Sequence, residues 1–282
     1  MFFKKRLEQN LSEHIIRITP LSGGDINDAY KIETTDNVYA LKVNNKSAFP
    51  GMFEKEKRGL EAISKSGARV PEVILTYIDA EYQYLLMEFI EEGFSNMDFW
   101  EKFAIGLARI HKTAGTQFGL DYDNYIGSLH QDNSQKSTWE SFFIENRLIP
   151  LVKSAFNYGT LQKKHLQYFE NFYKKVSEIV PQEKASLLHG DLWGGNLMKG
   201  KGSTPVFIDP AIYYGHREMD IAMTQMFGGF NNNYFGYYNE VFPMAPGWEG
   251  RIEIHNLYPN LVHLNLFGSG YLKSIENVIN RF

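Results

Sequence analysis

The sequence predicts an α+β protein with two lobes, in which a five-stranded antiparallel sheet and one main helix precede a mostly helical part. Two observations lead to this prediction. Short β-rich segments separated by turn residues fill the first third of the chain, and helical periodicity dominates after Gly93. A chain of 282 residues is long enough for two lobes of ordinary size. We therefore expect one lobe at residues 1–90 and a second at residues 91–282.

Five strands are expected in the first lobe. Each is a short run rich in β-branched or aromatic residues, and turn residues such as Asp36 and Asn37 separate neighbouring runs. The short connections favour antiparallel pairing of neighbours. The expected strands cover residues 15–21, 27–33, 38–43, 73–78 and 82–89.

One main helix is expected between the third and fourth strands. Phe53, Leu60 and Ile63 can share an apolar face, and charged residues surround them. Gly67 and then Pro71 follow the periodic segment, in the order in which glycine and proline end a helix.

The second lobe is expected to be mostly helical, with a small β insert at residues 186–209. Its helices are predicted at residues 98–111, 139–151, 161–180 and from 217 to the end of the chain. We find no internal repeat and no low-complexity linker in the sequence.

The composition excludes several classes of protein. The net charge of −4 argues against a nucleic-acid partner. No apolar run approaches the roughly 20 residues of a membrane span, and no secretory signal opens the chain, so a soluble cytoplasmic protein is expected. The chain has no cysteine, which excludes disulfides, thiolate nucleophiles and cysteine-ligated metals.

The segment around Asp191 carries the clearest chemical signal. An apolar strand leads into His189, Gly190 and Asp191, Asn196 follows five residues after the aspartate, and a second apolar strand ends at Asp209. This spacing matches the catalytic loop of kinases and their later metal-binding aspartate. Phosphoryl transfer needs a carboxylate beside the attacking hydroxyl and oxygen ligands for Mg²⁺.

We therefore assign Asp191 to the substrate hydroxyl, Asn196 and Asp209 to the metal, and His189 to holding the loop. An aspartate alone in a glycine-rich turn more often satisfies the backbone. The four residues together, between two apolar strands, favour the catalytic interpretation.

A kinase also needs a strand lysine on the α and β phosphates, paired with a helix glutamate. Lys42 lies on the third expected strand, directly ahead of the main helix. The helix carries Glu54, Glu56 and Glu61, and the spacing does not choose among them.

Two backbone segments complete the predicted nucleotide site. Gly23 and Gly24 lie between the first two strands, where a phosphate-covering loop belongs, although a plain hairpin turn is the commoner meaning. Glu88, Phe89 and Ile90 join the lobes at the position of a kinase adenine hinge. A Walker motif is absent, which argues against a P-loop enzyme.

Asp220 opens a later helix, where it either caps that helix or hydrogen-bonds the catalytic loop, and a structural role is favoured. The histidines do not pair at metal-binding spacing, which argues against a zinc site. The aromatic cluster at residues 227–238 is interpreted as core or pocket wall.

These motifs resemble the fructosamine kinase family, a part of the aminoglycoside phosphotransferase branch of the protein kinase-like fold. The likeness spans nearly the whole chain and rests on the segments at residues 21–24, 53–63, 118–124, 189–196, 207–211 and 215–223. The tryptophan at position 193 and the Phe-Gly-Leu-Asp segment that starts at Phe118 point to this family within the branch.

The resemblance implies an enzyme that uses ATP and Mg²⁺ to phosphorylate the third-carbon hydroxyl of a ketoamine, either a small molecule or a glycated lysine on a protein. It makes Asp191 the proton acceptor, gives Mg²⁺ to Asn196 and Asp209, and pairs Lys42 with Glu56. It places residues 88–90 at the ATP hinge, and it places Trp193 and the Phe-Gly-Leu-Asp segment near the sugar. Some relatives carry a phosphate-loop cysteine that this chain lacks, which rules out a thiol switch.

Two other functions stay open on the sequence. One is a kinase for another small alcohol, of the aminoglycoside, choline or homoserine type, because a fold does not choose a substrate. The other is an inactive nucleotide-binding scaffold, against which the intact set of Lys42, Asp191, Asn196 and Asp209 argues. We expect a monomer or a weak homodimer, without a nucleic-acid or membrane partner.

Overall fold

The computed structural model describes residues 3–21 and 26–282. Its first part is an antiparallel sheet with the strand order β1-β2-β3-β5-β4. The strands are β1 (Ile15–Leu21), β2 (Asp28–Thr34), β3 (Val38–Asn45), β4 (Val73–Ile78) and β5 (Tyr82–Glu88). The predicted five-stranded antiparallel sheet is therefore confirmed, with bounds that differ by one or two residues.

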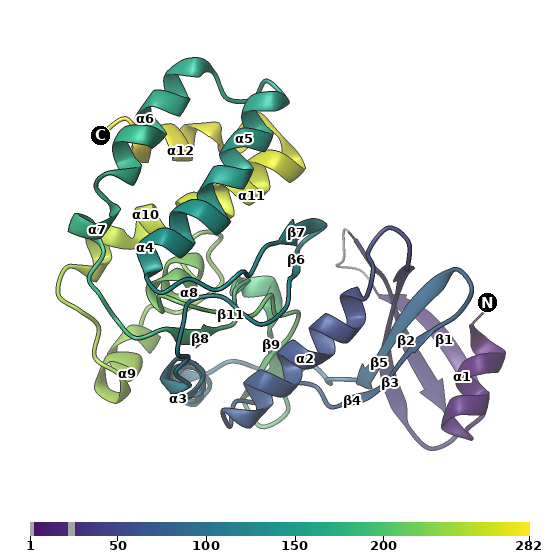
Figure 1. Ribbon diagram of the computed structural model, residues 1–282. Helices are drawn as coiled ribbons and strands as arrows, with labels where there is room; N and C mark the ends of the chain where they lie inside the picture. The colour runs from purple at the N-terminus through teal and green to yellow at the C-terminus, as the bar shows by residue number, and fades with distance from the viewer. Residues whose placement is uncertain (1–2, 22–25) are drawn as a thin grey trace.

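Helices cover both faces of this sheet. Because side chains alternate along a strand, Tyr84 and Leu86 of β5 pack with the short helix α1 (Lys4–Leu11), while Leu85 and Met87 pack with α2 (Met52–Lys65). The predicted apolar face of α2 is buried as expected. In Figure 1, α2 lies between the sheet and the helical part of the molecule.

The second part is mostly helical. Its longest helix, α3 (Met97–Lys112), packs on α9 and on strands β8 and β10 in the interior of this part. The other helices are α4 (Trp139–Phe142), the π-helix η1 (Phe143–Leu148), α5 (Ile149–Asn157), α6 (Lys163–Tyr173), α7 (Val176–Ile179), η2 (Gly194–Asn196), α8 (Glu218–Met223), α9 (Tyr234–Val241), η3 (Trp248–Arg251), α10 (Ile252–His255), α11 (Leu257–Phe267), η4 (Ser269–Tyr271) and α12 (Leu272–Ile279).

Three small antiparallel pairs lie among these helices. β8 pairs with β11, β9 pairs with β10, and β6 pairs with β7. The strands are β6 (Asn124–Ile126), β7 (Leu129–Gln131), β8 (Ser186–Leu188), β9 (Leu197–Gly200), β10 (Thr204–Phe207) and β11 (Tyr213–Gly215). Strands β8, β9 and β10 form the predicted insert. The hairpin β6–β7 was not predicted, because strands of three residues are too short to show alternation.

Two predicted helices differ from the structure. The segment expected at 161–180 is split into α6 and α7 by a turn at Lys174 and Lys175. The Lys175 amide there bonds to the Phe172 carbonyl at 2.8 Å, three residues back instead of the four of an α-helix. The segment expected at 139–151 extends to Asn157 and includes the π-helix η1. Among the described residues, no helix is at once long and apolar enough to cross a bilayer. The division between lobes at residue 90 stays a prediction, and it would fall between β5 and α3.

Candidate active site

Asp191 lies in a tight loop whose shape depends on a glycine. Strand β8 ends at Leu188, and Gly190 then takes a backbone φ of +81°, a conformation that side chains with a Cβ rarely adopt. A Cβ at position 190 would lie 2.1 Å from the Ala211 carbonyl oxygen. The loop is further tied to this segment by a hydrogen bond of 2.9 Å from the Ala211 amide to the His189 carbonyl. The glycine therefore lets the catalytic loop lie directly against the chain that follows Asp209.

Asn196 holds the carboxylate of Asp191. Its Nδ2 donates to Asp191 Oδ2 and to the Asp191 carbonyl oxygen, both at 2.9 Å. The surrounding protein disfavours a charge here, and the nearby Asp209 carboxylate adds repulsion, so the pKa of Asp191 rises to about 7. A carboxylate with this pKa can accept a proton near neutral pH.

Lys42 joins the sheet to the catalytic part. Its Nζ lies 2.6 Å from Glu56 Oε1 and 2.5 Å from Asp209 Oδ1. Burial alone would lower the pKa of Lys42, but the Asp209 and Glu56 carboxylates raise it above its ordinary value, so the amine stays charged. Among the three glutamates that the spacing left open, the structure brings Glu56 to the lysine, while Glu54 accepts from Thr76.

Asp209 takes an uncommon backbone conformation, with a φ of +55° two residues after the end of β10. A residue other than glycine in this region is strained, and such strain occurs often at functional sites. In this conformation the Asp209 carboxylate accepts a hydrogen bond from the Lys42 amine.

The donor set suits Mg²⁺, which prefers carboxylate and amide oxygens. Asp209 offers a carboxylate whose side chain is 39% exposed and therefore accessible. Asn196 uses its amide nitrogen on Asp191, which leaves its Oδ1 as the atom for a metal. The residues present thus fit the predicted metal role.

The Asp220 carboxylate accepts hydrogen bonds from the loop that carries Asp191. Its two carboxylate oxygens accept from the backbone amides of His189 at 2.7 Å and Gly190 at 2.9 Å. His111 Nε2 donates to the same carboxylate at 3.1 Å. Burial would raise the pKa of Asp220, but these hydrogen bonds, first that of His111, hold it below its ordinary value. Of the two roles left open for Asp220, the structure shows the bonds to the catalytic loop.

His189 holds the loop from within, as predicted. Its Nε2 donates to the Ile208 carbonyl at 2.9 Å, and its Nδ1 accepts from the Asp191 amide at 3.3 Å. Burial lowers the pKa of His189, which keeps the ring neutral. A neutral ring with both nitrogens engaged acts on the backbone and does not transfer protons.

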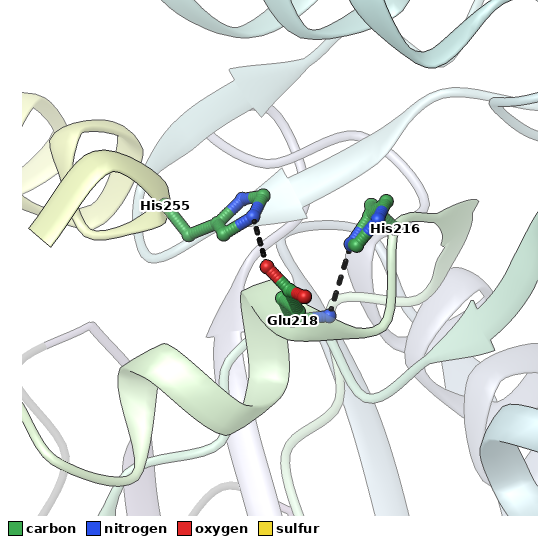
Figure 2. Close-up of side chains that lie close together, drawn as sticks. All are labelled: His216, Glu218 and His255. Carbon is green, nitrogen blue, oxygen red and sulfur yellow. Dashed lines mark hydrogen bonds and ion pairs between the residues drawn. The ribbon is translucent and has the colours of Figure 1, made fainter. Parts of the chain in front are cut away.

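The helix that carries Asp220 is fixed at its start by a buried cluster, shown in Figure 2. The Glu218 carboxylate accepts from His255 Nε2 at 3.1 Å, and the Glu218 amide donates to His216 Nδ1 at 3.3 Å. These three side chains could in principle hold a metal, because one ligand atom of each lies within 4.8 Å of the others. However, Arg251 donates to both oxygens of Glu218, at 2.8 and 2.6 Å, and so neutralises the carboxylate. We assign the cluster a structural role.

The predicted hinge residues follow strand β5, and their side chains differ in orientation. Glu88 is turned toward Arg69, which donates to its Oε2 at 2.6 Å. Lys31 lies over the Phe89 ring at 5.1 Å, and Ile90 is buried. Gly23 and Gly24, the predicted phosphate loop, fall outside the described residues.

Trp193 stands beside the catalytic loop with 40% of its surface exposed. Its ring covers Gly195, where a Cβ would lie 2.2 Å from the indole, and its edge meets Phe227 at 6.1 Å between centroids. Phe227 contacts His263 in turn at 4.9 Å. The sequence prediction put Phe227 in a possible pocket wall, but it missed His263, because no spacing connects α11 with the catalytic loop.

The Phe-Gly-Leu-Asp segment contacts helix α2, and its place near the sugar stays a prediction. Phe118 is buried in the helical part, and Asp121 pairs with Arg58 of α2 at 3.3 Å. The segment therefore contacts the helix that carries Glu56.

The chain is similar to known proteins over nearly its whole length. The model of the family described as fructosamine kinase matches residues 3–282. A protein of Enterococcus faecium named probable ketoamine kinase is 39% identical over 272 residues, which cover 94% of this chain and 95% of that protein. A chloroplastic protein-ribulosamine 3-kinase of Arabidopsis thaliana is 35% identical over 283 residues, covering 98% and 85% of the two chains.

Solved structures show the same relation. A protein of Thermobifida fusca described as a fructosamine-3-kinase has a TM-score of 0.89 at 31% identity, covering 98% of this chain and 96% of its own. An aminoglycoside phosphotransferase has a TM-score of 0.65 at 16% identity, covering 99% and 98% of the two chains, and it shares the fold.

Proposed function

The chain belongs to the fructosamine kinase family, and we propose that it transfers the terminal phosphoryl group of ATP to the third-carbon hydroxyl of a ketoamine, of the fructosamine or ribulosamine type. One observation carries this proposal. Lys42 pairs with both Glu56 and Asp209. The Asp209 carboxylate in turn acts on the charge of Asp191, which accepts a hydrogen bond from Asn196. This is the set that phosphoryl transfer requires.

Asp191 is the proposed proton acceptor. The sugar hydroxyl donates a hydrogen bond to its carboxylate, the hydroxyl oxygen bonds to the terminal phosphorus, and the bond to the bridging oxygen of ADP breaks. The proton passes to Asp191, whose pKa near 7 suits it to receive a proton at neutral pH. Asn196 keeps the carboxylate oriented through its Nδ2 hydrogen bond.

Lys42 binds and orients the α and β phosphates. Glu56 holds the amine in place, since the helix glutamate and the strand lysine form a nearly buried pair. Asp209 and Asn196 would hold Mg²⁺. When bound, this ion neutralises charge on the phosphoryl group during transfer.

The acceptor side is assigned to the exposed Trp193 and to Phe227 beside it. Two aromatic rings next to the catalytic loop form an apolar wall on which a sugar ring can pack and which excludes water. The hinge segment at residues 88–90 is assigned to adenine by its position between the lobes.

A phosphate-transfer screen with mass detection tests the function. The unmodified protein is incubated with MgATP and, in separate reactions, with ribulose-lysine, fructose-lysine, a glycated peptide, choline and an aminoglycoside. We expect a phosphorylated product from the ketoamines and far less of it in the same time with Asp191→Asn. Product from choline or the aminoglycoside alone would overturn the substrate assignment, and no product from any acceptor would favour an inactive scaffold.

Four finer expectations belong to the same proposal. Chelation of Mg²⁺ by EDTA abolishes turnover, and added Mg²⁺ restores it. The protein acts in the cytoplasm, and it is a monomer or a weak homodimer, which sedimentation over a range of concentrations measures. Both free and protein-bound ketoamines are candidate substrates.

A further inference from the structure

Helix α2 carries Glu56. It packs on the five-stranded sheet, and it also contacts segments of the second, mostly helical part of the chain. Gly59, one turn after Glu56, packs on the segment after Asp209: a Cβ there would lie 3.2 Å from Pro210 Cγ. Residues three apart on a helix share a face. The face that presents Glu56 to Lys42 is therefore in contact with the segment that follows the proposed metal ligand.

A second face of α2 is attached through two cation–π contacts. The Arg58 guanidinium lies 3.5 Å from the centroid of the Tyr122 ring, and the Lys55 amine lies 4.6 Å from the centroid of the Tyr125 ring. Arg58 also pairs with Asp121 at 3.3 Å. Both cations come from consecutive turns of α2, and both rings come from the segment that forms or precedes strand β6.

Tyr125 reaches the start of the same helix as well. Its hydroxyl donates to the Pro50 carbonyl at 3.1 Å, and its ring meets the edge of Phe49 at 6.2 Å. Pro50 immediately precedes Gly51, the residue that begins α2. The segment 121–125 thus contacts α2 at its first turn and again at its middle.

The other face of β6 is also held. Asn124 points away from α2 and donates to the Ile212 carbonyl at 2.8 Å, in the chain that follows Asp209. The strand therefore contacts both the helix that carries Glu56 and the segment that follows Asp209. Neither attachment serves the reaction directly, since no hydrogen bond or ion pair joins these side chains to Lys42 or Asp191 among the described residues.

From these contacts we infer that Lys55 and Arg58 of α2, with Tyr122 and Tyr125, form an aromatic clamp that positions Glu56, and through it Lys42, for the nucleotide. These four are positioning residues. The inference rests on the proposed function in naming the nucleotide, but the clamp itself is a property of the fold. It explains why the most charged face of α2, which looks like an ordinary solvated face in the sequence, lies against tyrosine rings.

The structure offers matched variants for the test. Arg58→Met keeps an apolar stem and removes the cation, while Arg58→Lys keeps a cation over the ring. Tyr122→Leu removes the ring face. Tyr122→Phe keeps the face and removes a buried hydroxyl that has no hydrogen-bond partner among the described residues, so it serves as the control.

Two readouts separate the clamp from the enzyme activity. The first is hydrogen exchange of the α2 amides, residues 52–65, without any ligand. The second is the dissociation constant for the non-hydrolysable analogue AMP-PNP with Mg²⁺. A cation–π contact at an exposed site corresponds to about a two- to fivefold change in an equilibrium. We expect Arg58→Met and Tyr122→Leu to speed exchange in α2 and to weaken AMP-PNP binding by about two- to fivefold. Arg58→Lys keeps a cation over the ring, so it should change exchange and affinity less than Arg58→Met does. Tyr122→Phe should match the unmodified protein.

If hydrogen exchange of the α2 amides is unchanged in Arg58→Met, the clamp is refuted. Because Arg58 is exposed, this variant should fold even if Tyr122→Leu does not. Faster exchange with unchanged AMP-PNP affinity would overturn the link from the clamp to the nucleotide site. In kinetics with a ketoamine, KM for ATP should rise while KM for the ketoamine stays constant, and the reverse pattern would count against the inference. If the unmodified protein phosphorylates no ketoamine, the substrate assignment fails, and the exchange and AMP-PNP measurements still decide the clamp.

Discussion

The carboxylate of Asp220 offers the sharpest test of how the catalytic loop is held. The change Asp220→Asn keeps the size of the side chain and leaves one oxygen that can accept. The other oxygen becomes an NH₂ group, which cannot accept from a backbone amide. In the unmodified protein the two oxygens accept from the backbone amides of His189 at 2.7 Å and Gly190 at 2.9 Å. In the variant one of these amides must lose its hydrogen-bond acceptor.

The magnitude follows from the burial of this group. Asp220 is 1% exposed, so water cannot replace the lost acceptor. Leaving one buried donor without a partner costs about 1–3 kcal/mol in the free energy of unfolding. The loop that carries Asp191 also shifts, and a displacement of about 1 Å at a reacting group can lower turnover about 100-fold. We expect a loss in both quantities, with kcat reduced about 10- to 100-fold.

Urea denaturation and steady-state kinetics measure the two effects. Glu249→Gln is the matched control, because it makes the same carboxylate-to-amide change at an exposed position of η3. The control should change stability by less than about 0.5 kcal/mol and leave kcat unaltered. If Asp220→Asn behaves like Glu249→Gln in both measurements, the proposed anchoring of the loop is refuted.

Three further changes probe the site and its support. Gly190→Ala should lower the free energy of unfolding by about 2 kcal/mol or more, because it combines a left-handed backbone with a clash at Ala211. Gly202→Ala is the control: its backbone is also left-handed, but its Cβ meets no atom within 4 Å, so it should cost only about 1 kcal/mol. Equal losses in urea denaturation would argue against the close approach of Gly190 to Ala211. Lys42→Met should weaken MgATP binding about 10- to 100-fold by calorimetry, and unchanged affinity would remove Lys42 from the site. Arg251→Met should cost about 3–5 kcal/mol, since the buried Glu218 carboxylate loses its arginine partner and keeps only the hydrogen bond from His255, and a loss under 1 kcal/mol would refute the pairing.

The Glu218 pair also predicts a dependence of stability on pH. Burial would raise the pKa of Glu218, but hydrogen bonds from Arg251 and His255 lower it to about 2, from an ordinary value of 4.5. The stabilisation is therefore complete above pH 4.5 and is lost as the pH falls toward 2. In Arg251→Met this acid-dependent loss should shrink, and an unchanged pH profile of unfolding would contradict the assignment.

Local patterns predicted the parts of the structure that depend on local physics. The five strands and the apolar face of α2 follow from alternation and helical spacing, which sequence displays directly. The array of His189, Asp191, Asn196 and Asp209 was visible because one turn and two short strands hold these residues together.

Spacing alone did not predict features that depend on packing between distant segments. It left Glu54, Glu56 and Glu61 open, and only the family resemblance selected Glu56. The choice depends on the rotation of α2 about its axis, which the contacts of Gly59 with Pro210 and of Lys55 with the Tyr125 ring fix. The contact between Phe227 and His263 depends on the packing of α11. No spacing in the chain encodes either arrangement.

The direct test of the account is the turnover of Asp191→Asn. The amide keeps an oxygen for the Asn196 hydrogen bond, so the fold and the affinity for MgATP should match those of the unmodified protein. Removing the proton acceptor should lower kcat for a ketoamine about 10²- to 10⁴-fold. Full turnover by this variant, with nucleotide binding intact, would contradict the claim that Asp191 accepts the hydroxyl proton.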